Sequence, residues 1–173
     1  MDLVLKQGRV LSKVNQTGKG LAMHLDTQFS IFMINKPGVL ARILNELANA
    51  KINIVAMTMM DSMEHGVMRL VGTAKERIRE VLNKLNLQYS ETDVLCLNLP
   101  NKAGAFADVT EKLAKAHINI AYAYCTAGAR GGRTTAVVKV ADVKKAMKVL
   151  QEHTDIPNTK TNNAVRRSPV RRK

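Results

Sequence analysis

Hydrophobic and polar residues follow two different patterns along this chain, one typical of strands and one typical of helices. Strand-forming residues predominate in 27–35, TQFSIFMIN, and the segment ends in an Asn-Lys-Pro-Gly turn, which predicts a strand followed by a tight turn. Beyond the turn, apolar residues recur at steps of three and four, which predicts a helix with one buried face. The residues of this stripe are Leu40, Ile43, Leu44, Leu47 and Ala48. Burial of each Leu or Ile is worth about 1.5–3 kcal/mol, so we expect the stripe to face a sheet.

The same two patterns continue to residue 91 and define a complete unit. We expect two strands joined by the loop SMEHG, then a second helix with Ile78, Val81, Leu82 and Leu85 on its inner face, then a short closing strand. The strands span 53–61, 67–72 and 87–91, and the helix spans 75–85. The predicted order is β-α-β-β-α-β.

The chain then repeats itself. NKPGVLARILNELANAKINI (35–54) returns 66 positions later as NKAGAFADVTEKLAKAHINI (101–120), which indicates a duplicated unit. The second unit is expected to comprise strands at 93–99, 119–127 and 134–140, a helix with Phe106, Val109, Leu113 and Ala114 inward, and a helix at 142–152. Its closing strand is harder to find. TDIPN (154–158) and the N-terminal DLVLKQ (2–7) are the two candidates.

This order predicts an α+β fold of two tandem ferredoxin-like βαββαβ units, each an antiparallel sheet in the strand order 4-1-3-2 with both helices on one face. Units of this size have marginal cores alone, so we expect them to pack together. The predicted divisions are an N-terminal extension (1–26), a first unit (27–91), a second unit (92–156) and a basic tail (157–173). In this order a third strand separates Cys96 from Cys125. Their Cα atoms should then lie about 9–10 Å apart, too far for a disulfide.

Charge is unevenly distributed. The net charge is +13, and residues 157–173 hold six basic and no acidic residues. This segment has no hydrophobic periodicity and is expected to be a disordered, dispensable end, with weak attraction to polyanions as the alternative. The candidate anion contacts are Arg166, Arg167, Arg171, Arg172 and Lys173. The two cysteines show no metal or disulfide spacing and the first 25 residues no signal-peptide core, which favours a cytoplasmic protein.

Several function classes are disfavoured. The third strands, VMRLVG and TTAVVKV, carry no aromatic residue for stacking on RNA bases. The four histidines stand apart in the sequence, so we expect neither a catalytic group nor a metal, and nothing indicates a cofactor. The loop GARGGR (128–133) lacks the Lys and hydroxyl of a phosphate-binding loop and is better interpreted as a basic hairpin turn.

The duplicated pattern Asn-x-Pro-Gly, with INI after the helix, resembles the ACT domain, a small-molecule-sensing module attached to many enzymes of amino-acid metabolism. The resemblance covers residues 27–152 and implies a stand-alone, amino-acid-binding tandem ACT protein that forms a homodimer. It also implies ligand contacts at the turn before each first helix and at the Asn that opens each second strand. These residues are Asn35, Lys36, Pro37, Gly38, Val39, Leu40 and Asn53 in the first repeat, and Asn101, Gly104, Ala105, Phe106 and Asn119 in the second.

Physical chemistry supports such a site and also offers a structural alternative. A helix N-terminus presents free backbone N–H groups to a carboxylate, and Gly38 and Gly104 let it approach closely. Alternatively, each Asn braces a turn or opens a strand. Lys51 and His117 replace the Gly common before INI, so those turns are expected to be built differently. Ala103 replaces Pro37 and should loosen the second turn, while Met33 and Leu99 stand where serine-sensing relatives place a His.

Three hypotheses of function follow. The first is a non-enzymatic sensor that binds an amino acid or related metabolite where ACT modules meet. The second is a regulatory subunit that holds a separate enzyme, which an exposed hydrophobic patch would favour. The third is an anion-binding or nucleic-acid-binding regulator that acts through the tail, and a nucleic acid partner is the least favoured of these.

Overall fold

The computed structural model describes residues 21–61, 65–126 and 132–152. Within them the chain forms a single antiparallel sheet in the order β2-β3-β1-β4-β6-β5, and four helices. The elements are β1 (Ala22–Ile34), α1 (Val39–Asn49), β2 (Ile54–Asp61), β3 (His65–Gly72), α2 (Lys75–Lys84), β4 (Gln88–Pro100), α3 (Ala105–Lys115), β5 (Ile120–Cys125), β6 (Arg133–Val140) and α4 (Val143–Glu152). The predicted α+β class with two ferredoxin-like units is confirmed.

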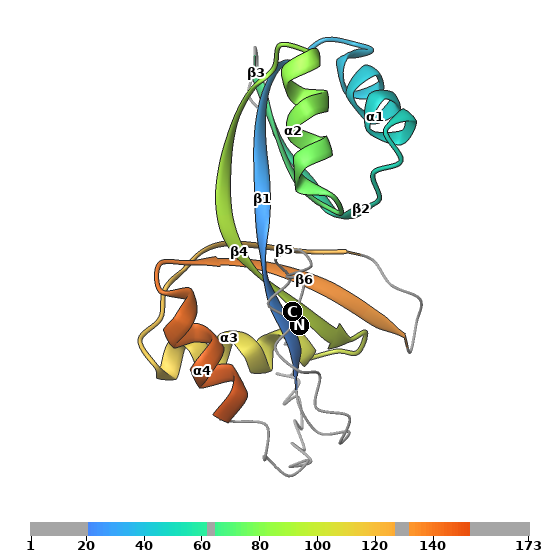
Figure 1. The fold of residues 1–173 in the computed structure, drawn as a ribbon. Coiled ribbons are helices and arrows are strands. Elements are labelled where there is room, and N and C mark those ends of the chain that lie inside the picture. The colour runs from blue at the N-terminus through green and yellow to red at the C-terminus, as the bar shows by residue number, and fades with distance from the viewer. Residues whose placement is uncertain (1–20, 62–64, 127–131, 153–173) are drawn as a thin grey trace, which may run out of the picture.

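Two long strands run through both units. Figure 1 shows β1 and β4 continuing from the upper unit, which carries α1 and α2, into the lower unit, which carries α3 and α4. The first unit has the order β4-β1-β3-β2 and the second β1-β4-β6-β5. Both therefore match the predicted order 4-1-3-2.

The closing strand of the second unit is the N-terminal part of β1. Ala22 to Asp26 pair with Asn98 to Val94 of β4. An N-terminal segment does fill this edge, but its residues are 22–26. The two candidates from the sequence, residues 2–7 and 154–158, lie outside the described residues. The first strand therefore begins five residues earlier than expected, and the strands expected at 87–91 and 93–99 are one continuous strand.

The ladder between β1 and β4 is symmetric about one residue pair. Thr27 pairs with Asp93, and these residues are 66 positions apart, the same offset that separates Asn35 from Asn101. Equivalent positions of the two repeats therefore lie symmetrically about the Thr27–Asp93 pair, which marks a pseudo-twofold axis.

Three cores follow from the alternation along the strands. Under α1 and α2, the first core includes Phe29, Ile31, Met68 and Leu70. Under α3 and α4, the second includes Met23, Leu95, Leu97 and Val138. On the opposite, helix-free face, where the curled sheet brings the units together, Ala56, Val71, Val94, Cys96 and Val137 form a smaller third core.

The helix ends correct one expectation. Lys51 and His117 do adopt the left-handed backbone, with φ of 53° and 55°. In each case the residue's N–H bonds back to the helix and the next residue does the same, as with Lys51 to Ala48 (2.8 Å) and Ile52 to Leu47 (3.0 Å). These paired bonds form the Schellman motif, and burial of the following Ile offsets the strain of a non-glycine residue. The turns are therefore built as they would be with glycine.

The thiols lie as predicted. Cys96 on β4 pairs with Val137 and Cys125 on β5 pairs with Ala136, so β6 separates them. Both cysteines are free. Among the residues described, no helix is both long and apolar enough to cross a membrane.

Candidate functional site

The first predicted turn connects the end of β1 to the start of α1. Gly38 caps the helix in a left-handed conformation, with φ 87° and ψ −19°, and no side chain caps the helix. The first helical bond is donated by Arg42 N–H to the Gly38 carbonyl at 2.9 Å. The N–H groups of Leu40 and Ala41 come before that bond and point out of the helix end, as helix geometry requires. The turn thus presents backbone donors of the kind that bind carboxylates.

The second turn has the same construction. Gly104 caps α3 with φ 84° and ψ −16°, again without a side-chain cap, and Asp108 N–H bonds to its carbonyl at 3.0 Å. Asn101 N–H also donates to the Gly132 carbonyl at 2.8 Å, which ties this turn to the segment before β6. Replacement of Pro37 by Ala103 leaves the cap dihedrals almost unchanged. Whether it loosens the turn stays a prediction.

The two glycines are required by their backbone conformation. A Cβ atom added at Gly38 or Gly104 meets nothing within 4 Å. A side chain at either position would therefore obstruct only a ligand or a second chain. Within one chain, it is the positive φ angle that disfavours any residue other than glycine.

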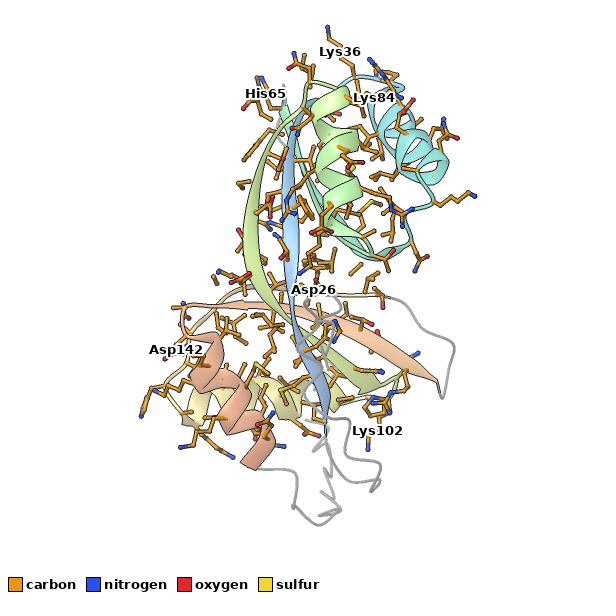
Figure 2. The ribbon with its side chains drawn as sticks, viewed as in Figure 1. Asp26, Lys36, His65, Lys84, Lys102 and Asp142 are labelled. Carbon is orange, nitrogen blue, oxygen red and sulfur yellow. The ribbon has the colours of Figure 1, made fainter. Side chains whose placement is uncertain are left out.

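A groove lies beside the second turn. It has a volume of about 180 Å³, and its lining includes Leu21, Pro100, Lys102 and Ala105. A second groove of about 300 Å³ runs between α1 and α2, past Glu46, Asn49 and Lys84, and contains none of the predicted residues. Figure 2 shows Lys36 and Lys102 at opposite ends of the molecule, so the two turns cannot share one ligand within a chain.

Asn53 and Asn119 lie far from the turns of their own repeats. On β3, Ile34 pairs with His65 and Ile54 with Gly72, seven residues further along. At 3.3 Å per residue, Asn35 and Asn53 are separated by roughly 23 Å. The second repeat shows the same spacing along β6, between Arg133 and Val140. One unit therefore does not bring the two predicted asparagines together, and a shared site needs a second module.

The backbone of Asn53 has a structural role. Its N–H donates to Thr73 Oγ1 at 3.1 Å, and its carbonyl accepts from Thr73 N–H at 3.0 Å. The residue itself is exposed. Both readings of this position, strand opening and ligand contact, therefore remain compatible with its geometry.

The junction of the units contains polar groups that the sequence did not single out. Gln28, fully buried, donates from Nε2 to Tyr122 Oη at 2.8 Å and accepts at Oε1 from Tyr124 Oη at 3.1 Å. The Arg69 guanidinium lies over the Tyr122 ring at 4.0 Å. These contacts join β1 and β3 to β5. In the sequence, these contacts were indicated only by Gln28, a polar residue inside a segment of strand-forming residues.

Ionisable groups gather on the same face, near the pseudo-twofold axis. Burial alone would raise the pKa of Asp26, but hydrogen bonds from His24, Lys75 and the Thr27 N–H outweigh it and lower the pKa to about 2. Burial raises the pKa of the Cys96 thiol to about 12, and the Asp26 charge adds to the shift. Asp26 is labelled between the two units in Figure 2.

Comparison with known proteins agrees with this architecture. A family model described as an ACT domain pair matches residues 23–160. No curated protein matches the chain. A protein from Bacteroides thetaiotaomicron of known crystal structure is 27% identical, with a TM-score of 0.69, over 75% of this chain and 89% of that one.

Two more distant structures share the fold. The ligand-free regulatory subunit of aspartate kinase from Thermus thermophilus is 15% identical, with a TM-score of 0.55, over 76% of this chain and 92% of that one. Aspartokinase III of E. coli, in complex with lysine and aspartate, is 20% identical, with a TM-score of 0.50, over 76% of this chain and 31% of that one.

Proposed function

Because the chain belongs to the ACT domain pair family, whose model spans residues 23–160, we propose that it is a non-enzymatic regulatory protein that binds a free amino acid or a similar carboxylate metabolite. The site is the turn from Asn35 to Leu40, with the turn from Asn101 to Phe106 as its second copy. The observation that carries the proposal is the start of α1, where a left-handed Gly38 and the absence of a side-chain cap leave backbone donors facing outward.

The ligand carboxylate accepts hydrogen bonds from the N–H groups near Gly38 to Leu40. Lys36 and Pro37 shape the turn, and Val39 begins the helix. Asn53 contributes from a second copy of the chain, because it lies roughly 23 Å from Asn35 within one unit. The protein is thus a homodimer whose interface the ligand tightens by mass action.

Calorimetry with the ligand found in a thermal-shift screen of the common amino acids tests the site. We expect Asn53→Ala to lose roughly 1–3 kcal/mol of binding free energy with its fold intact, because a polar group of the ligand loses its partner. Gly38→Val should bind more weakly still. Asn119→Ala and Gly104→Val, the matched changes in the second repeat, report whether that copy binds.

Mixing variants tests the two-chain arrangement. Asn35→Ala and Asn53→Ala should each weaken binding by roughly 1–3 kcal/mol. A mixture of the two should regain sites of wild-type affinity, because each chain supplies the residue that the other lacks. If a ligand is found and neither variant changes its affinity, the turn is architecture only.

An exposed apolar patch favours a second candidate, a regulatory subunit that holds a separate enzyme. Phe32, Ile34 and Met60 are 48%, 53% and 49% exposed. By their pairing with Val67 and His65 of β3 they lie together on the helix-free face of the first unit. Replacing Phe32 by Ser should then release a co-purifying enzyme and leave amino-acid affinity unchanged. The basic tail proposed for anion binding lies outside the described residues.

A further inference from the structure

We propose that His24, Asp26 and Cys96 form a binding site for a divalent transition metal of the zinc class at the junction of the two units. One nitrogen of His24, one carboxylate oxygen of Asp26 and the sulfur of Cys96 all lie within 4.8 Å of one another. The spacing of ligands along the sequence gave no sign of this site. His24 and Cys96 are 72 positions apart, and only the β1–β4 pairing brings them together.

The strand geometry explains the cluster. His24 and Cys96 are direct partners in the antiparallel ladder, and Asp26 follows His24 by two residues, which puts its side chain on the same face. Zinc bonds of about 2.0–2.3 Å separate neighbouring ligand atoms by roughly 3.3–3.8 Å in a tetrahedron. A closure of about 1 Å is therefore needed, and the half-exposed His24 side chain can supply it by rotation.

The burial of the three ligands suits a site that opens to solvent. Cys96 is fully buried and forms its base. The side chains of Asp26 and His24 are 16% and 55% exposed, so they form its wall and its rim. A metal can enter past His24, and water occupies the fourth position.

The Asp26 carboxylate is held with one oxygen turned to the cluster. Oδ1 accepts from the Thr27 N–H at 2.8 Å and lies 3.0 Å from Lys75 Nζ. Oδ2 lies 3.6 Å from His24 Nε2. Lys75 Nζ is held further by Thr27 Oγ1 at 2.9 Å. The carboxylate can therefore offer Oδ2 to a metal while Oδ1 keeps its contacts with the Thr27 N–H and Lys75.

The chemistry of the ligands selects the metal. A sulfur, a nitrogen and an oxygen ligand suit Zn²⁺ or Co²⁺ and not Ca²⁺ or Mg²⁺, which prefer oxygen alone. The positive charge of Lys75 further disfavours weakly bound cations. Because the free thiol is protonated, binding replaces the S–H bond by an S–metal bond and releases one proton to solvent for each ion bound.

Metal binding would also hold the first residues of β1 in the second unit. Its ligands come from β1 and β4, on the part of their ladder where the first residues of β1 complete the second unit. The ion therefore cross-links the strands on which both units depend, and it stabilises the folded chain by an amount that rises with the logarithm of its affinity.

Titration of the full chain with CoCl₂ under reducing conditions tests the site. We expect one Co²⁺ per chain, a near-ultraviolet band from thiolate-to-cobalt charge transfer, and one proton released. Cys96→Ser should abolish the band, and His24→Asn should weaken binding roughly a hundredfold. His65→Asn and Cys125→Ser, the matched changes away from the cluster, should have no effect. Lys75→Gln should tighten binding several-fold.

Two results would overturn the proposal. One is the absence of a charge-transfer band at stoichiometric Co²⁺. The other is a band that survives His24→Asn unchanged or is lost in Cys125→Ser. Should Cys96→Ser fail to fold because Cys96 is buried, the His24→Asn protein, altered at a half-exposed position, decides the outcome.

Discussion

The two units share one architecture but assemble it from different parts of the chain. In the first unit, the outer strand next to β1 is the start of β4, which follows α2 directly. In the second, the corresponding strand is the start of β1, more than 60 residues before the rest of that unit. The helix caps, Schellman ends and strand registers are nevertheless nearly identical. Spatial symmetry is thus preserved even though the connectivity differs.

Because of this exchange of strands, the two units are not independent domains. Met23, on the first residues of β1, lies in the core under α3 and α4, while Phe29, six residues later, lies in the core under α1 and α2. A change in β1 or β4 therefore reaches both cores, whereas a change in a helix affects one.

Removal of the shared segment should have the largest effect. Two truncated proteins, one beginning at Leu21 and one at Thr27, differ by Met23 and by five ladder pairs with β4. We expect the shorter protein to lose at least about 3 kcal/mol in free energy of unfolding, from lost apolar burial and unpaired backbone groups. Urea denaturation followed by circular dichroism measures it.

Amide hydrogen exchange locates the loss. Protection should fall first in β6, α3 and α4 of the shorter protein. Equal stability of the two proteins would mean that the start of β1 contributes nothing to the second unit.

The ion pair at the junction should have the next largest effect, and it depends on pH. Lys75 of α2 binds Asp26, whose folded pKa of about 2 lies below the ordinary value of 3.8. The contacts of the Asp26 carboxylate with His24, Lys75 and the Thr27 N–H together contribute about 2 kcal/mol above about pH 4, and this is lost as the pH falls toward 2. Asp26→Asn should be destabilised by that amount at pH 7 with chelator present, and should match the wild type near pH 2. A constant difference across the range would contradict this assignment.

The helix caps test the equivalence of the repeats. Gly38→Val and Gly104→Val should each cost about 1–2 kcal/mol, since both sites have a φ angle near 85° and no neighbour within 4 Å of the new Cβ. Thermal and urea unfolding of the two variants should agree. A much smaller loss at Gly104 would show that Ala103, in place of proline, lets the second turn relax.

The smallest effects are expected at the helix ends. Lys51→Gly and His117→Gly should stabilise the protein by about 0.5–1 kcal/mol each, because glycine adopts the left-handed backbone without strain. Lys84→Gly, inside the last turn of α2, is the control and should destabilise by a similar amount. Destabilisation by Lys51→Gly would mean that its side chain makes an unrecognised contact.

The order of elements could be predicted because the repeat and the hydrophobic rhythms are local properties of the chain. The apolar stripe from Leu40 to Leu47 and the strand-forming residues around Phe29 each indicate locally that the segment is buried. The exchange of strands could not be predicted in this way. Whether Met23 contacts β4 depends on a pairing between segments more than 70 residues apart, and the alternation of residues 23–26, MHLD, does not indicate which strand they pair with.

Of the candidate site, too, only the local features could be predicted from the sequence. Asn35 and Gly38 were recognisable from the turn they form, and the left-handed cap gives that glycine its physical reason. The separation of Asn35 from Asn53 required the strand register. The prediction that the turn at Lys51 is built differently was wrong. A left-handed backbone is unfavourable for an isolated residue other than glycine, but here two backbone hydrogen bonds and the burial of Ile52 offset that strain.

The pairing centred on Thr27 and Asp93 bears on the origin of this chain. A ladder symmetric about that pair is self-complementary, so a single repeat would present the same edge to another copy of itself. Two such copies would exchange their first strands and form an isologous dimer with this six-stranded sheet. The tandem chain therefore has the architecture that such a dimer would have if its two chains were joined end to end. The repeats could diverge at their turns, while mutations in β1 and β4 remained constrained by both.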